Sequence, residues 1–66
     1  MELTEKDQDK ILKSALKTIG LKDDRMFFMA VITGQEHPDD ATKVEYKGEV
    51  YYVTIKHGDF VCIFLN

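Results

Sequence analysis

The residues best suited to chemistry are the single cysteine, both histidines and the carboxylates of one short polar stretch: Cys62, His37, His57, Glu36, Asp39 and Asp40. A cysteine and histidine metal site needs more ligands, at closer spacing, than these residues supply. A cysteine nucleophile needs an adjacent base, and the spacing places neither histidine beside Cys62. The sequence also lacks the known phosphate-binding, hydrolase and metalloprotease motifs. We therefore expect a non-enzymatic protein that has no metal site, no cofactor and no catalytic residues.

Residues 34–41 form the longest polar segment and include the only proline. The acidic loop residues Glu36, Asp39 and Asp40 lie here beside His37. Such a loop could bind a cation weakly or contact a basic partner. Proline and aspartate are also ordinary turn formers, and nothing fixes these carboxylates in a ligand geometry. The sequence therefore favours a plain solvated turn.

The chain has 66 residues, a formal net charge of −3 and a pI near 5.2. This length predicts a single domain, 1–66, whose stability is thin enough for self-association to be useful support. The acidic balance argues against a nucleic-acid or membrane-surface binder. No segment approaches the ~20 apolar residues of a membrane span, and the N-terminal residues lack the features of a signal peptide. We expect a cytoplasmic protein, and the lone Cys62 fits a reducing compartment.

Residues 4–19 have the pattern of an amphipathic helix. Thr4 and Asp7 have the spacing of a helix cap, and Gly20 is a typical C-terminal stop. The apolar residues between them recur at helical spacing and predict one stripe that packs on a sheet: Ile11, Leu12, Ala15, Leu16 and Ile19.

Three segments rich in β-branched and aromatic residues, 43–47, 49–56 and 59–65, predict an antiparallel meander with turns at Lys47-Gly48 and His57-Gly58. Residues 26–33 are apolar throughout, so periodicity cannot separate a strand from a helix. We favour a strand, because the segment is short and ends in Val31-Ile32-Thr33. A second helix remains the alternative. The predicted fold is α+β, with the helix on an antiparallel sheet of three or four strands.

Two-residue turns at both positions fix the register of the meander and divide its side chains between two faces. The predicted core face carries Val44, Tyr46, Tyr51, Val53, Ile55, Phe60, Cys62 and Phe64. The opposite face carries Val50, Tyr52, Thr54, Val61, Ile63 and Leu65. One helix covers only one face of a sheet, so we expect the opposite face to lack a cover within the chain.

An exposed apolar face of this size is typical of a protein-binding surface. We expect the partner-binding residues to be Val50, Tyr52, Val61, Ile63 and Leu65, and the partner to be another protein or a second copy of the chain. Chains of this size without catalytic motifs are typical of regulators or inhibitors, including accessory proteins of phages and mobile elements.

Two alternative functions involve nucleic acid. The sheet aromatics Tyr46, Tyr51, Tyr52, Phe60 and Phe64 could stack the bases of a single strand, although the neighbouring carboxylates oppose this. Alternatively, the carboxylates could mimic a nucleic acid and block an enzyme that binds it: Glu36, Asp39, Asp40, Glu45 and Glu49.

Overall fold

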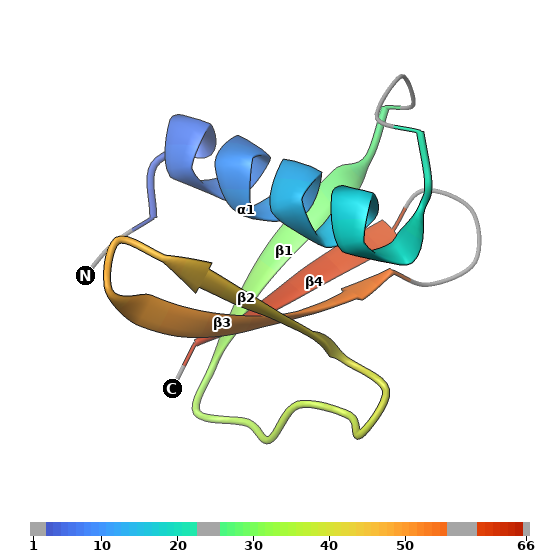
Figure 1. Cartoon of the computed structure of the whole chain (residues 1–66). Coiled ribbons are helices and arrows are strands. Elements are labelled where there is room, and N and C mark those ends of the chain that lie inside the picture. The colour runs from blue at the N-terminus through green and yellow to red at the C-terminus, as the bar shows by residue number, and fades with distance from the viewer. Residues whose placement is uncertain (1–2, 23–25, 56–59, 66) are drawn as a thin grey trace.

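The computed structural model describes residues 3–22, 26–55 and 60–65. One helix and four strands follow in chain order: α1 (Glu5–Ile19), β1 (Phe28–Thr33), β2 (Thr42–Tyr46), β3 (Glu49–Ile55) and β4 (Phe60–Leu65). The strands form one sheet in the order β1-β4-β3-β2, and α1 lies across one of its faces (Figure 1). The predicted α+β fold, with one helix packed on a sheet, is confirmed.

Helix α1 begins and ends at the capping residues that the sequence indicates. Thr4 Oγ1 accepts a hydrogen bond from the Asp7 amide, and Asp7 Oδ2 accepts one from the Thr4 amide, both at 3.1 Å. Gly20 has a left-handed backbone with φ of 82°, and its amide donates to the Leu16 carbonyl at 2.9 Å. Both helix ends are therefore satisfied by local groups.

The β2–β3 hairpin has the predicted turn and the predicted register. Lys47 and Gly48 have φ of 50° and 80°, as a two-residue turn with positive φ at both central positions requires. Tyr46 consequently pairs with Glu49, and Val44 pairs with Tyr51.

The predicted register between β3 and β4 is wrong by one residue. Val53 lies opposite Ile63 rather than Cys62, and Tyr52 rather than Tyr51 lies opposite Phe64. The predicted turn at His57-Gly58 falls in 56–59, outside the described residues. A slip of one residue exchanges the two faces of a strand, and β4 is apolar on both, so its pattern could not exclude the slip.

The strand predicted at 26–33 is confirmed as β1, Phe28–Thr33. It pairs in parallel with β4, so that Phe28 lies beside Phe60 and Ala30 beside Cys62. The sheet is thus mostly antiparallel with one parallel pair, and β1 and β2 form its two edges.

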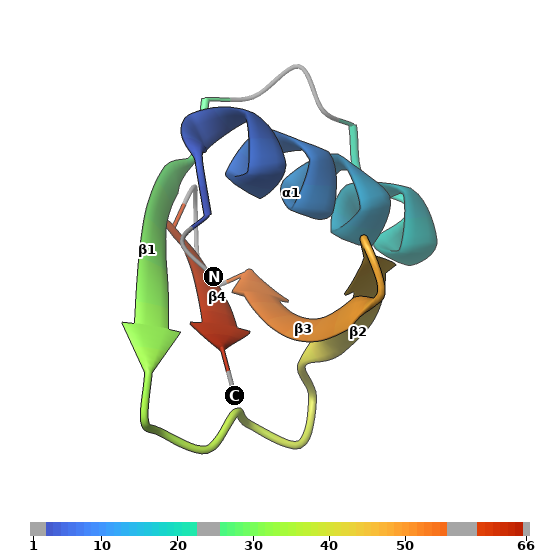
Figure 2. The same ribbon diagram turned by 90° about the vertical axis from the view of Figure 1, so that its left-hand side faces the viewer.

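The segment 34–41 connects these two edges and passes on the side of the sheet opposite α1 (Figures 1 and 2). The expectation that this face has no cover within the chain is therefore wrong for the part that the segment covers, whereas Phe28 and Phe60 on the same face are exposed. Thr54, Cys62 and Phe64 point to this face, and each is buried.

The main core lies between α1 and the sheet. The helix packs chiefly against β2 and β3. The buried residues of this core are Ile11, Leu12, Ala15, Leu16, Val44, Tyr51, Val53, Val61 and Ile63. Within the described part of the chain, no helix has the length and apolar character needed to cross a membrane.

Candidate functional site

Large exposed apolar side chains gather around β1. We call Met26, Phe28, Val31 and Phe60 the β1 patch; their exposed fractions are 88, 74, 37 and 46%. Phe28 and Phe60 are neighbours in the parallel register and share the face opposite α1. Val31 lies beside Ile63, on the face that carries α1. The patch therefore flanks β1 on both faces.

Strand β1 also has a free backbone edge. It pairs with β4 on one side, and no described strand pairs with it on the other. Its sequence, FMAVIT, contains no charged residue, glycine or proline. Natural proteins usually protect an edge strand with charges, proline or a bulge, because unpaired backbone groups are a template for another strand. The edge of β1 has none of the protecting residue types.

The five predicted partner-binding residues do not share one face of the sheet. Val50 and Tyr52 are half-buried on the face opposite α1. Val61 and Ile63 are fully buried in the main core, and Leu65 packs against that core. The register slip causes this correction, because it turns the odd-numbered residues of β4 toward α1.

Tyr52 is engaged within the chain. The His37 ring stacks on the Tyr52 ring with centroids 3.6 Å apart and an interplanar angle of 11°. His37 Nδ1 lies 2.9 Å from the Pro38 carbonyl oxygen, a contact that orients the imidazole. The stack holds segment 34–41 against the sheet, so the Tyr52 ring is not free for a partner.

The acidic loop residues are exposed. Glu36 and Asp39, together with Gly34, Gln35, His37 and Leu65, line a depression of about 530 Å³. Asp40 is exposed as well. Among residues 3–22, 26–55 and 60–65, no group of three or more His, Cys, Asp or Glu side chains could hold a metal ion. The loop is a solvated connection whose one aromatic contact is His37 on Tyr52.

The aromatic side chains considered for base stacking do not form a platform. Tyr51 and Phe64 are buried, and Tyr52 is stacked on His37. Tyr46 binds a carboxylate of α1, which leaves Phe60 as the exposed ring of the five. Base stacking requires exposed ring faces, so this arrangement does not favour a nucleic-acid site.

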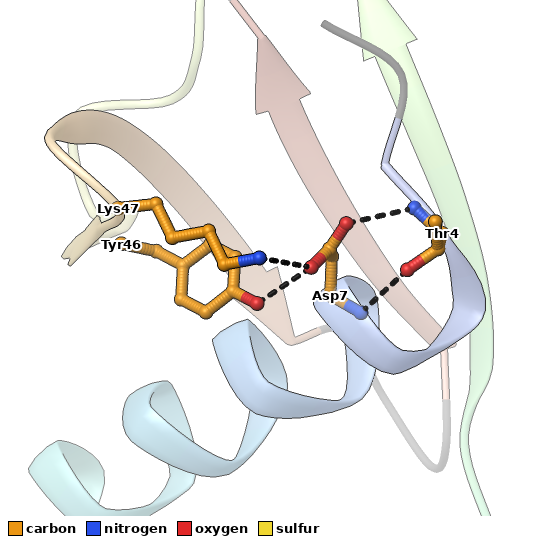
Figure 3. Close-up of polar contacts among 4 residues, drawn as sticks. All are labelled: Thr4, Asp7, Tyr46 and Lys47. Carbon is orange, nitrogen blue, oxygen red and sulfur yellow. Dashed lines mark hydrogen bonds and ion pairs between the residues drawn. The ribbon is translucent and has the colours of Figure 1, made fainter.

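A polar cluster joins the β2–β3 turn to the start of α1 (Figure 3). The Tyr46 hydroxyl donates to Asp7 Oδ1 at 2.5 Å, and Lys47 Nζ lies 3.6 Å from the same oxygen. Lys47 Nζ also lies 5.4 Å from the centre of the Tyr46 ring. The capping role of Asp7 was predictable, but its contact with Tyr46 was not, because the two residues are 39 positions apart.

These contacts explain the electrostatics of the cluster. The pKa of Asp7 falls from 3.8 to about 2, first because Tyr46 donates a hydrogen bond to its carboxylate and then because the Thr4 amide does. The same hydrogen bond to Asp7 raises the pKa of Tyr46. All three charged or polar groups are satisfied by one another, so the cluster serves to position α1 on the hairpin.

Comparison of the chain with protein-family models, curated proteins and solved structures finds no significant match. The uncharged edge of β1 and the neighbouring β1 patch are the features of the described residues that suggest a function.

Proposed function

We propose that this protein is a small, non-enzymatic interaction module that binds another polypeptide along the free edge of β1. The supporting observation is that an uncharged edge strand coincides with the largest exposed apolar side chains of the described residues. A partner strand would form backbone hydrogen bonds with β1, while the β1 patch would contact its side chains.

Backbone hydrogen bonds and apolar contact both contribute to the strength of such binding. Phe28 is 74% exposed, and burying a phenylalanine side chain contributes about 2 kcal/mol. Each added backbone hydrogen bond contributes about 1 kcal/mol net. Phe60 lies beside Phe28 on the same face and extends the contact surface toward β4.

Such a module acts by occupying or reshaping its partner, as a regulator or an inhibitor does. We place this action in the cytoplasm. The buried, unpaired Cys62 and the acidic net charge of −3 support that choice, since the chain has no second cysteine for an internal disulfide.

Site-specific photo-crosslinking tests the proposal. Phe28 is replaced by p-benzoylphenylalanine, and Glu45 is replaced in a matched control on the same face at the opposite edge. In an extract of the source cells, we expect irradiation to join position 28, but not position 45, to a polypeptide. Mass spectrometry identifies the product, whether it is a second copy or a different protein. Equal yields from the two positions would overturn the proposal.

A further inference from the structure

Resting on the proposed function, we infer that the polypeptide bound by β1 is a second copy of this chain, joined through antiparallel β1–β1 pairing about a two-fold axis. Four features support a second copy as the partner: the absence of charged residues in β1, the residue order of β1, the position of α1 and the charged side chains of β2 at the opposite edge.

Self-pairing of β1 brings no charged side chains together. The strand FMAVIT is uncharged over its whole length, so two copies can approach without like-charge repulsion and without desolvating an ion. Its exposed side chains are the apolar Phe28 and Val31, which lie on opposite faces, and the uncharged Thr33.

The two-fold axis restricts the register. Two identical antiparallel strands in one sheet can be related only by a two-fold axis normal to the sheet. This rotation places the same face of both copies on the same side of the joined sheet. With Ala30 on the axis, Ala30 pairs with its own copy, and Phe28 lies opposite Ile32 of the second copy. The smallest side chain of the strand then lies at the centre, and each exposed Phe28 packs on a half-buried Ile32.

The position of α1 allows this approach. Both helices lie on the same side of the joined sheet, because the axis is normal to it. Each helix packs chiefly on β2 and β3, which are the strands farthest from the axis. The main helix contacts therefore lie away from the new interface (Figure 2).

The assembly stops at two copies. After β1 pairs with β1, the joined sheet ends on both sides in β2. Strand β2 carries exposed Lys43 and Glu45, with Nζ and Oε1 3.8 Å apart. Charged side chains of this kind protect an edge against further strand addition, so the contact closes as a dimer.

Cysteine cross-linking tests the pairing and its register. Ala30→Cys is made in a Cys62→Ala background, because Cys62 is the neighbour of Ala30 within the chain. Under oxidation by diamide, we expect the purified protein to form a disulfide-linked species of twice the chain mass. Val31→Cys in the same background is the matched control. Residue 31 lies on the face opposite that of residue 30. In the register centred on Ala30 it does not lie opposite residue 31 of the second copy, so Val31→Cys should not cross-link.

Light scattering of the purified wild-type chain gives an independent measurement. We expect twice the chain mass, falling to the mass of one chain on dilution. A single-chain mass at every concentration, or a cross-link through Val31→Cys instead of Ala30→Cys, would overturn the inference. If position 28 nevertheless captures a different protein from the extract, the proposed function stands. If it captures nothing more than position 45 does, both proposals fail.

Discussion

The two halves of the sheet differ in their contacts with α1, in the charge of their edges and in their exposed apolar side chains. The β2–β3 half lies under α1, is tied to it by Tyr46 and Lys47 through Asp7, and carries charged side chains at its edge. The β1–β4 half has an uncharged edge and holds the whole β1 patch. Both halves contribute to the main core, but the exposed apolar side chains of the sheet gather on the second half.

This difference indicates that the two halves of the sheet have different roles. The hairpin and helix satisfy their polar groups locally, through caps and a tight turn. Among the described strands, β1 pairs only with β4, so its other edge is available for pairing. Measurements of stability, association and pH dependence on substituted chains test this difference.

The largest effect is expected at the shared core of the two halves. Ile63→Ala should lower the free energy of unfolding by about 2–5 kcal/mol, because Ile63 is fully buried between α1 and the sheet. Urea unfolding followed by circular dichroism measures the change. Phe28→Ala is the control. At protein concentrations too low for association, its free energy of unfolding should change by no more than about 0.5 kcal/mol. Unchanged stability of Ile63→Ala would place Ile63 outside the core.

A smaller effect is expected on association. Phe28→Ser should weaken dimer formation at least tenfold, since about 2 kcal/mol of apolar contact is lost from each copy. Sedimentation equilibrium measures the dissociation constant. Ile19→Ser is a matched control, because Ile19 is 47% exposed and lies at the end of α1. Equal weakening by both variants would contradict a specific role for β1.

The smallest effect concerns the link between α1 and the hairpin. The folded pKa of Asp7, about 2, lies below its ordinary value of 3.8, so its ionised form stabilises the fold above pH 3.8. That contribution should disappear as the pH falls from 3.8 to about 2. Unfolding of the wild type and of Asp7→Asn across this range measures it. The difference between the two proteins should shrink with acidity; a constant difference would contradict the linkage.

The sequence predicted the parts of the fold that local signals determine. Thr4, Asp7 and Gly20 mark the ends of α1, and Lys47-Gly48 fixes the β2–β3 register, because caps and two-residue turns act over a few residues. The shortness of the β1 segment and its Val31-Ile32-Thr33 ending favoured a strand but left a helix open. Its parallel pairing with β4 is non-local and could not be read from the pattern.

The candidate site was harder to predict for a specific reason. Both faces of β4 are apolar, so Val61 and Ile63 could be exchanged with Cys62 and Phe64 without violating the alternation. The predicted surface consequently included core residues. The absence of charge in FMAVIT was visible in the sequence, yet it became informative only when the sheet order placed that strand at an edge.

The partnership between β1 and β4 has a consequence for synthesis on the ribosome. The only described strand that pairs with β1 follows all the other described strands in the chain, whereas α1 and the β2–β3 hairpin can form as soon as they emerge. The nascent chain must therefore carry an unpaired, apolar FMAVIT segment until β4 leaves the exit tunnel. Transiently exposed apolar surface and an unpaired strand edge make a nascent chain prone to misassembly during this interval.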